Sequence, residues 1–386
     1  MKACIMCGGE GTRLRPLTFD RPKPTIPILN KPSVLHLVEH LASEGFSEIV
    51  ITLGYLGNYI EEALGDGRIF GVHIDYVKEK TQLGTAGSVK NAEPLLSDEP
   101  FIVLGGDHVT DLNLREMYRS HEQNDAPVTI GLLPIEDPHE YGIAEMDVFH
   151  QIHRFLEKPR AGEIFSNLAS TGIYICDPDI LTMIPHGVNF DFAKDLFPMM
   201  MERGHRLNGY LVREQWTDIG NPAAYREACK WKLEQLPGTI ITGHINIKDA
   251  NVVGPVNIGN GVSIGIDSAL VGPINIGENT TIGDQVLIGP YTSIGEYCVI
   301  EDGARILSSI LFDDVGIGRN SCVSGSIMDN SIKIGCNCVL ETGTIIGPRV
   351  IIRDNVTIHS HVNLWPELTI PEGIDVRENV LNPEFK

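Results

Sequence analysis

A glycine-rich loop with two arginines follows the first apolar segment of the chain. Gly8, Gly9 and Gly11 are followed directly by Thr12, Arg13 and, two residues later, Arg15. Glycines allow backbone N–H groups to approach a polyphosphate, and guanidinium groups neutralise its charge. The loop has neither the GxGxxG spacing nor the Gly-Lys-Ser/Thr of a Walker A loop. It predicts a phosphate site of another kind, with a turn that only reverses the chain as the alternative.

Four further charged residues stand beside strand-like runs or prolines. Asp107 ends the segment FIVLGGD, and Asp218 lies two residues after Trp216. Lys23 and Lys158 each precede a proline. Each residue taken alone also fits a turn or a solvated charge.

Charge and composition exclude several classes of protein. The chain has 51 acidic and 30 basic residues, a formal charge of −21, and this sign repels the phosphate backbone of nucleic acids. A locally basic pocket remains compatible with a small anion, because net charge describes only the outer field. The first segment lacks a signal-peptide pattern, and no run of ~18 apolar residues occurs. We expect a cytoplasmic protein that binds neither nucleic acid nor a membrane.

Eight cysteines do not form a double CxxC pattern with the spacing of zinc ligands. Cys4 and Cys7 form a single CxxC inside an apolar run. This placement predicts buried thiols on a strand, and a redox pair is the alternative.

The first half of the chain alternates short apolar runs with amphipathic segments. The runs are ACIMC, EIVITL, IDYV, FIVLGG, VTIGLL and GIYIC, which are typical of buried strands. One amphipathic segment begins after Ser33, the expected N-cap, and its apolar face is formed by Val34, Leu35, Val38 and Leu41. The alternation predicts an α/β fold, a Rossmann-like, mostly parallel sheet sandwiched by helices. Ligands bind such sheets at the carboxyl ends of the strands.

The second half repeats every six residues. One aliphatic register consists of Val252, Ile258, Ile264, Leu270, Ile276, Ile282, Ile288, Ile294, Ile300 and Ile306. A second register runs from Ile334 to Val376, after an irregular stretch around residues 307–333. Glycine follows the aliphatic residue in several pairs, where tight corners need a residue without a Cβ. Stacked six-residue turns predict a parallel β-helix.

A helix separates the two halves. Residues 222–235 have a helical pattern, and Pro237-Gly238 ends it. We therefore expect an α/β domain over residues 1–236 and a β-helix domain over residues 237–386. Residues 245–376 resemble the left-handed β-helix of hexapeptide-repeat proteins, and the resemblance alone implies the handedness. Because a β-helix has flanks and ends to cover, we expect a homo-oligomer formed through this domain.

More motifs accompany the glycine loop in the first domain. After GGEGTRLRPLT come RPKP, NKP, LGTAG, GGD, YG, EKP, TGIY and WTDIG. In this order they resemble the sugar-nucleotide pyrophosphorylases, which join an NTP to a hexose 1-phosphate, over about residues 1–225. The segment FAKD at residues 192–195 departs from the family, whose members often carry Glu at the position of Ala193. No role for that side chain carries over.

The resemblance implies a role for each matching residue. Arg13 would hold the β- and γ-phosphates of the NTP, Lys23 the phosphates at the reacting end, and Lys158 the sugar phosphate. Asp107 and Asp218 would bind Mg²⁺, the implied cofactor, and Glu157 would accept hexose hydroxyls. The other residues implied to bind substrate are Gly8, Gly9, Gly11, Thr12, Gly84, Thr85, Gly106, Tyr141, Gly142, Gly172 and Tyr174.

The reaction implied by the resemblance needs no general base. A phosphate oxygen of the sugar 1-phosphate attacks the α-phosphorus of the NTP, and pyrophosphate leaves. The nucleophile is already an anion near neutral pH, because the second pKa of a phosphate monoester is ~6. The site must therefore position two anions and stabilise their charge.

Glu79 bears on the choice of base. Mannose-1-phosphate guanylyltransferases resemble this chain in having Glu four residues before the Leu-Gly pair, whereas thymidylyl- and uridylyltransferases commonly have Gln. One carboxylate accepts both the N1–H and the 2-amino group of guanine, while uracil and thymine suit an amide. We predict GTP and mannose 1-phosphate as substrates. An exposed Glu79 without a base contact is the alternative.

Three other functions remain open. The chain could be a glucose-1-phosphate thymidylyl- or uridylyltransferase, a bifunctional nucleotidyl- and acetyltransferase, or a regulatory subunit that holds a sugar nucleotide without making it. Acetyl transfer needs a histidine-bearing site, and the segment around His359 and His361 has no acetyltransferase motif. A regulatory chain should lack a phosphate-binding cation or a metal carboxylate, and this chain keeps them.

Overall fold

Two compact units make up the protein, seen here in a computed structural model that describes residues 1–385. The first unit contains Met1–Glu10, Pro22–Thr25 and Pro32–Ile219. The second contains Gly11–Arg21, Ile26–Lys31 and everything from Gly220 on. Two short segments of the N-terminal region thus belong with the C-terminal part of the chain. No helix within residues 1–385 has the length and apolar character needed to cross a lipid bilayer.

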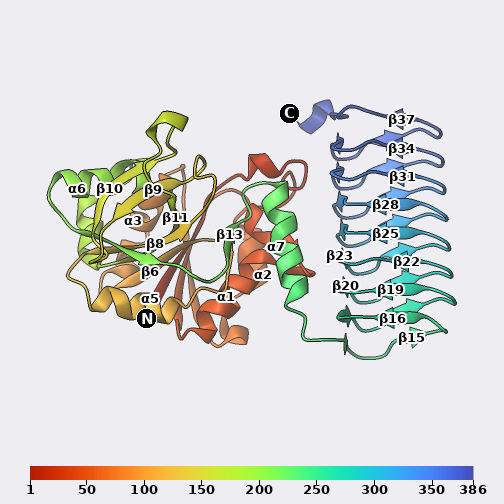
Figure 1. The fold of residues 1–386 in the computed structure, drawn as a ribbon, viewed down its shortest axis with the longest axis horizontal. Helices are drawn as coiled ribbons and strands as arrows, with labels where there is room; N and C mark the ends of the chain where they lie inside the picture. Colours follow the sequence, from red (N-terminus) through yellow and green to blue (C-terminus); the bar gives the residue numbers. More distant parts are fainter. Residues whose placement is uncertain (386) are drawn as a thin grey trace. The chain divides into compact units, whose positions relative to one another are not determined.

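A nine-stranded mixed sheet forms the centre of the first unit (Figure 1). Its parallel part consists of β5 (His73–Lys78), β4 (Glu48–Leu53), β1 (Lys2–Cys7) and β6 (Phe101–Gly105). The other part consists of β11 (Leu168–Cys176), β8 (Val128–Pro134), β9 (Gly142–Met146), β10 (Ile152–Glu157) and β12 (Leu207–Leu211). All six apolar runs expected as strands are strands here. The sheet is mixed because β11 adds to β6 in the antiparallel direction.

Helices cover both faces of this sheet, so each face has its own apolar core. The first core receives side chains from α1 (Ser33–Ser43), α2 (Asn58–Leu64) and α5 (Leu114–Glu122). The second receives them from α3 (Gly84–Asn91), α4 (Glu93–Leu96) and α6 (Phe197–Glu202). The expected α/β sandwich is confirmed.

Cys4 and Cys7 lie on opposite faces of β1. Cys7 belongs to the first core and Cys4 to the second, and both are free thiols. Burial raises the pKa of Cys4 to about 12 and the pKa of Cys7 well above its usual value, so both stay protonated. The prediction of buried thiols on a strand is confirmed. The alternative of a redox pair is not supported, because side chains three residues apart on a strand point to opposite faces of the sheet.

Ser33 is the first residue of α1 and not its N-cap, so that expectation is wrong. Pro32 occupies the cap position, and the Ser33 hydroxyl donates to the Pro24 carbonyl oxygen at 2.9 Å. The hydroxyl has found an acceptor in another segment, which the local sequence does not reveal. In contrast, Asn221 caps α7 (Pro222–Glu234) through its side-chain oxygen, which accepts from two backbone N–H groups at 3.0 Å.

Most of the second unit is a β-helix of three eight-stranded parallel sheets, running from β14 (Ile240–Ile241) to β37 (Asp375–Val376) (Figure 1). Every third strand along the chain joins the same sheet. The register residues from Ile258 onward point inward and form one continuous buried core. This arrangement is consistent with the left-handed β-helix expected from the hexapeptide repeat.

The break in the repeat comes from two shortened sides of the coil. Ile276 pairs with Ile294, eighteen residues further along. Ile294 pairs with Leu311, and Leu311 with Met328, at a spacing of seventeen residues. The spacing returns to eighteen between Met328 and Ile346. The inward-pointing positions are kept, and two corners each lack one residue. This explains the irregular stretch at residues 307–333.

Glycines after the inward residues give clearance between stacked coils. A Cβ on Gly318 would lie 2.5 Å from the carbonyl carbon of Gly335 in the next coil. The positive φ values at these corners belong to other residues, such as Asn320 with φ 57°. The expectation of corners that need a residue without a Cβ is confirmed, and the reason is the close approach of two backbones.

We expect Gly318→Ala to lower the free energy of unfolding by about 1–3 kcal/mol, because two stacked backbones must separate. Gly316→Ala is the matched control in the same coil, since a Cβ there would have no heavy atom of residues 1–385 nearer than the Ile332 carbonyl oxygen at 3.9 Å. Guanidinium titrations of both variants measure the difference. Equal loss of stability in the two variants would contradict this account.

An ion pair ties the segment Gly11–Arg21 into the second unit. Arg21 Nη2 lies 2.5 Å from Asp329 Oδ1, and the Arg21 guanidinium stacks over Phe312 with 5.1 Å between the guanidinium carbon and the ring centroid. Asp329 is 1% exposed. Burial raises the pKa of Asp329 to about 6, although the Arg21 guanidinium opposes this shift.

This shift predicts a pH-dependent stability. The folded state binds a proton on Asp329 more tightly than the unfolded state, so stability from this group declines as pH rises from about 4 to about 6. Relative to Asp329→Asn, the parent chain should lose up to about 3 kcal/mol of unfolding free energy between pH 4 and pH 7. Urea titrations at several pH values test this, with exposed Asp125→Asn as control. A difference that does not change with pH would refute it.

Candidate active site

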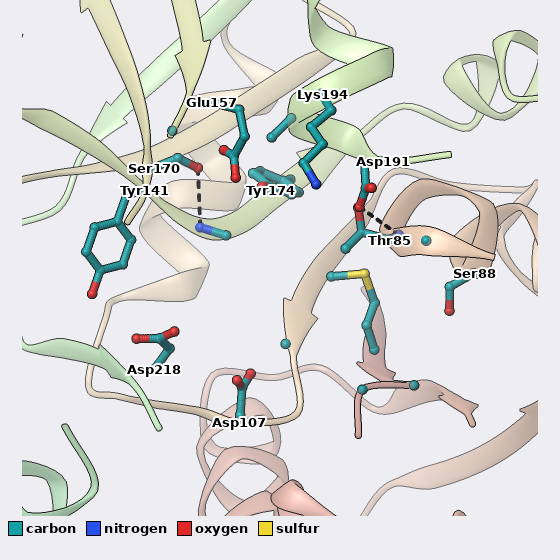
Figure 2. A pocket seen from close by; sticks show the side chains of 18 of the residues that line it. Thr85, Ser88, Asp107, Tyr141, Glu157, Ser170, Tyr174, Asp191, Lys194 and Asp218 are labelled. Atoms are coloured by element: carbon teal, nitrogen blue, oxygen red, sulfur yellow. Dashed lines mark hydrogen bonds between the residues drawn. The ribbon is translucent and has the colours of Figure 1, made fainter. Parts of the chain in front are cut away.

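A cavity of about 580 Å³ opens in the first unit at the carboxyl ends of β1, β5 and β6 (Figure 2). This is the edge where ligands are expected in an α/β sheet. The residues of the sequence prediction that line it are Gly8, Gly9, Glu79, Gly84, Thr85, Asp107, Tyr141, Gly142, Glu157, Lys158, Gly172, Tyr174 and Asp218. The structure thus brings together residues from motifs far apart in the sequence.

Other predicted residues lie elsewhere. Gly106 is outside the described lining, and a Cβ there would overlap the Cys7 sulfur. Gly11, Thr12 and Arg13 belong to the second unit, in and before the short helix η1 (Thr12–Leu14), and are outside the described lining. Their roles at the phosphates stay predictions.

Asp107 is held ionised by a lysine. It lies two residues after the end of β6, and the Lys23 ammonium, from η2 (Lys23–Thr25), donates a short hydrogen bond to its carboxylate. Burial disfavours the charged carboxylate, yet Lys23 and His108 outweigh burial and lower the pKa of Asp107 to about 2. Lys23 is therefore engaged with Asp107 rather than lining the cavity itself.

His108 is a cavity residue that the sequence prediction missed. The Gly105 N–H donates to His108 Nδ1 at 3.3 Å, so Nε2 carries the proton of the neutral ring, and it lies 4.0 Å from Asp107 Oδ1. Burial lowers the pKa of His108, although Asp107 and Asp218 oppose this. The ring packs edge-on against Trp216. A neutral N–H thus faces the carboxylate side of the cavity.

Asp218 reaches the same cavity from a second strand pair. β13 (Trp216–Asp218) runs antiparallel to β7 (His108–Thr110), which places Asp218 opposite His108. Figure 2 shows the Asp107 and Asp218 carboxylates extending into the cavity. No cluster of three or more potential metal ligands occurs within residues 1–385. Two carboxylates fit a divalent cation that takes its remaining ligands from substrate phosphates and water.

The lining carries more negative than positive groups. Its carboxylates are Glu79, Asp107, Glu140, Glu157, Asp191 and Asp218, and its lysines are Lys158 and Lys194. Such a wall repels phosphorylated substrates unless additional positive charge enters. This balance is a second reason why the residues present fit a divalent cation.

Lys158 sits in a strained backbone conformation beside the cavity. Its φ is 47°, in the left-handed region that residues other than Gly, Asn and Asp rarely adopt. The Lys158 N–H donates to the Tyr141 carbonyl oxygen at 3.0 Å. This hydrogen bond joins the residue after β10 to the residue before β9. Strain of this kind is found at functional sites, where the surrounding structure imposes it.

Glu157 and Tyr174 form a polar group on another wall (Figure 2). Burial raises the pKa of Glu157, although Lys158 and Lys194 oppose this shift. Burial also raises the pKa of Tyr174, whose hydroxyl therefore remains a neutral donor. A Cβ on Gly142 would lie 2.8 Å from Glu157 Oε2, so the glycine leaves room for the carboxylate. The wall offers acceptors and a donor to hydroxyl groups.

A clamp between Thr85 and Asp191 was also missed. The Thr85 N–H and hydroxyl donate to Asp191 Oδ1 at 3.2 and 3.0 Å, and the Phe192 N–H donates to the Thr85 hydroxyl at 2.9 Å. These bonds attach the start of α3 to the segment that carries Ala193 and Lys194, which both line the cavity. The FAKD motif was the available signal, but the sequence does not show that it meets Thr85.

Glu79 is the residue after β5 and lies opposite the glycine loop. Its carboxylate accepts a short hydrogen bond from the Ser88 hydroxyl and a weaker one from the Leu83 N–H at 3.4 Å. A Cβ on Gly8 would be in ordinary contact with Glu79 Oε1 at 3.5 Å. Glu79 is half-buried, so the structure does not support the alternative of an exposed surface glutamate.

Two sequence-family models match the chain. Residues 2–235 match "Nucleotidyl transferase", and residues 270–380 match "GMPPB C-terminal domain". The chain belongs to the nucleotidyl transferase family. The enzyme class expected from the sequence is therefore confirmed.

Relatives named for different bases match most of the chain. The UTP–glucose-1-phosphate uridylyltransferase of Synechocystis sp. is 34% identical over 90% of both chains. The mannose-1-phosphate guanylyltransferase catalytic subunit beta of Danio rerio is 32% identical over 97% of this chain and 98% of its own. The structure of HddC from Yersinia pseudotuberculosis, 28% identical, covers 60% of this chain and 99% of its own with a TM-score of 0.52. Overall similarity therefore does not specify the base.

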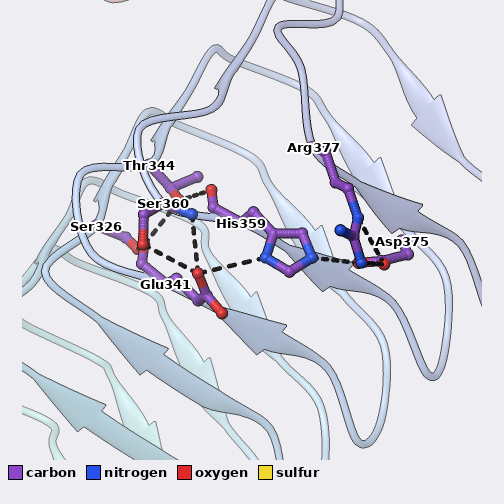
Figure 3. A network of polar contacts seen from close by, with 7 residues as sticks. All are labelled: Ser326, Glu341, Thr344, His359, Ser360, Asp375 and Arg377. Atoms are coloured by element: carbon purple, nitrogen blue, oxygen red, sulfur yellow. Dashed lines mark hydrogen bonds and ion pairs between the residues drawn. The ribbon is translucent and has the colours of Figure 1, made fainter.

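In the β-helix, His359 belongs to a network of polar contacts (Figure 3). His359 Nε2 lies 2.5 Å from Asp375 Oδ1 and Nδ1 lies 3.5 Å from Glu341 Oε2, so both ring nitrogens face carboxylates. The Arg377 guanidinium binds the same Asp375 at 2.6 Å. The network links successive coils and lends no support to His359 as an acetyl-transfer base.

Proposed function

We propose that the chain transfers a guanylyl group from GTP to mannose 1-phosphate, giving GDP-mannose and pyrophosphate. Membership of the nucleotidyl transferase family supports the reaction class, and the named guanylyltransferase relatives support the substrates. The single observation that carries the choice of guanine is the Glu79 carboxylate in the lining of the first-unit cavity.

Glu79 suits a guanine base because of how it is held. Ser88 and the Leu83 N–H fix the carboxylate, and its remaining lone pairs are free to accept from N1–H and the 2-amino group of guanine. The glycines of the loop opposite allow close approach of a nucleotide. A uracil or thymine ring would place a carbonyl oxygen against the carboxylate, which is repulsive.

The chemistry requires positioning more than proton transfer. Lys158, fixed by its backbone, would bind the sugar phosphate, and Glu157 with Tyr174 would accept and donate to sugar hydroxyls. Arg13 and Lys23 would bind the NTP phosphates, Lys23 while paired with Asp107. Holding the phosphate nucleophile close to the α-phosphorus lowers the barrier through orientation and charge stabilisation.

Asp107 and Asp218 would hold Mg²⁺ in this site. The ion would neutralise phosphate charge in a cavity whose own lining is acidic. Lys23 keeps Asp107 ionised, so this chain prepares that carboxylate before a metal binds.

Uridylyl or thymidylyl transfer to glucose 1-phosphate is the second candidate. The Synechocystis relative, named a uridylyltransferase, favours it at 34% identity. The regulatory-subunit alternative is less supported, because the lining retains both metal carboxylates and Lys158.

We also infer self-association through the β-helix. Its first coil exposes apolar side chains, with Val253 61% and Ile241 49% exposed, and its first strands are terminal strands of the three sheets. Uncapped coils of repeat proteins are covered by polar caps or by partners, and the exposed apolar side chains of this coil favour a partner.

We expect Asp218→Asn to lower kcat/KM by about 100- to 1,000-fold, because one metal ligand loses its charge. The Mg²⁺ concentration for half-maximal activity should rise as well. Pyrophosphate release measured against Mg²⁺ concentration gives both quantities, with Asp125→Asn as the exposed control. Wild-type turnover by a folded Asp218→Asn chain would exclude the metal role.

We expect Glu79→Gln to lower kcat/KM for GTP by about 10- to 100-fold, since hydrogen bonds to a charged group contribute about 1.5–3 kcal/mol. Activity with UTP should stay constant or increase, because an amide matches the uracil edge. Pyrophosphate release with each NTP and either mannose or glucose 1-phosphate measures both. A parallel fall for GTP and UTP would indicate structural damage and not base recognition. Absence of release for every pair in the wild-type chain would refute the proposed function.

A further inference from the structure

A second cavity, of about 720 Å³, lies inside the second unit between α7 and the β-helix. From α7 it is lined by Arg226, Cys229 and Lys230, and from the coils by Tyr291 and His361, among others. Its volume is in the range of small-molecule sites. The described linings of the two cavities share no residue, so the catalytic site does not account for this one.

Arg226 lines this cavity, and its guanidinium has one unsatisfied nitrogen. Its side chain is half-buried, and Nη2 is fully buried with no hydrogen-bond partner among residues 1–385. Burial lowers the pKa of the Arg226 guanidinium, which reflects the cost of a charge without a counter-ion. Buried guanidinium groups are normally paired, and a phosphate offers the bidentate acceptors that match their geometry.

A second cation stands one turn further along the same helix. Lys230 is four residues after Arg226 and so shares its helix face, and its ammonium lies 5.4 Å from the centroid of the Tyr291 ring. Glu227 is the single carboxylate in the described lining. The cavity is thus locally positive in a chain whose formal charge is −21.

The coil side of the cavity supplies a polar edge and an apolar wall. Gly343 leaves space for the His361 imidazole, which a Cβ at this position would overlap. Tyr291, Ile310 and Ile345 provide aromatic and aliphatic surface. A bare inorganic anion would leave that surface and most of the volume unused, whereas an organic phosphate would cover it.

We propose that this cavity binds a phosphorylated small molecule, with the phosphate on Arg226 and Lys230 and the organic part against Tyr291 and the isoleucines. A nucleotide and a sugar phosphate share this chemistry. The proposal does not depend on the reaction in the first unit, because it concerns binding alone.

Calorimetric titration of the full chain tests it, with AMP, glucose 6-phosphate, inorganic phosphate and glucose as probes. We expect Arg226→Gln to weaken binding of at least one organic phosphate tenfold or more, and Lys230→Gln to weaken it severalfold. Arg305→Gln and Lys333→Gln, exposed cations on the β-helix, are the matched controls and should bind as the parent does. All four variants leave the first-unit cavity unchanged, so differences report the second cavity.

The probes distinguish a nucleotide from a sugar phosphate as the ligand of this cavity. Tighter binding of AMP identifies a nucleotide site, and tighter binding of glucose 6-phosphate a sugar-phosphate site. Binding of inorganic phosphate with equal affinity would refute the role of the organic part. Lys230 is exposed, so Lys230→Gln should fold even if Arg226→Gln does not. Unchanged affinities for every probe in folded Arg226→Gln and Lys230→Gln would overturn the proposal, whatever the enzymatic activity.

Discussion

Electrostatic repulsion is the constraint on which the catalytic cavity depends. In the proposed reaction, two phosphorylated substrates would meet in a space whose described lining holds six carboxylates and two lysines. Asp107 is kept ionised there by Lys23 despite burial, and Asp218 approaches from the paired strand. Charges of this sign are costly to assemble unless a cation joins them. The divalent cation proposed for this site would offset the charge of both the acidic wall and the anionic substrates.

The fold forms that cavity with few unusual local conformations. Parallel strands end at one edge, so residues that follow β1, β5 and β6 converge there without any special geometry. The exceptions are informative. Lys158 takes a left-handed conformation, and His108 is buried as a neutral ring beside a carboxylate. Both depart from the ordinary preference of their residue type, and both line the cavity.

The β-helix is built on a different principle. Each coil repeats the inward aliphatic positions, and glycine corners let the backbones stack closely. Two coil sides lose a residue and the core still remains continuous, because the inward position tolerates a change in corner length. Helix α7 against these coils encloses a locally positive cavity, so the second unit offers more than a rigid scaffold.

Local periodicity in the sequence determined the strands of the sheet, the helix at residues 222–234 and the β-helix register. The spacing of apolar residues along the chain shows which side chains will be buried in each of these elements. Most of the site residues that motif order identified line the cavity. Only the tertiary structure decided that Ser33 donates to Pro24, that Thr85 clamps Asp191, that His108 faces Asp107, and that Arg13 belongs to the second unit. These features depend on contacts between segments distant in the chain, and no local pattern encodes such a contact.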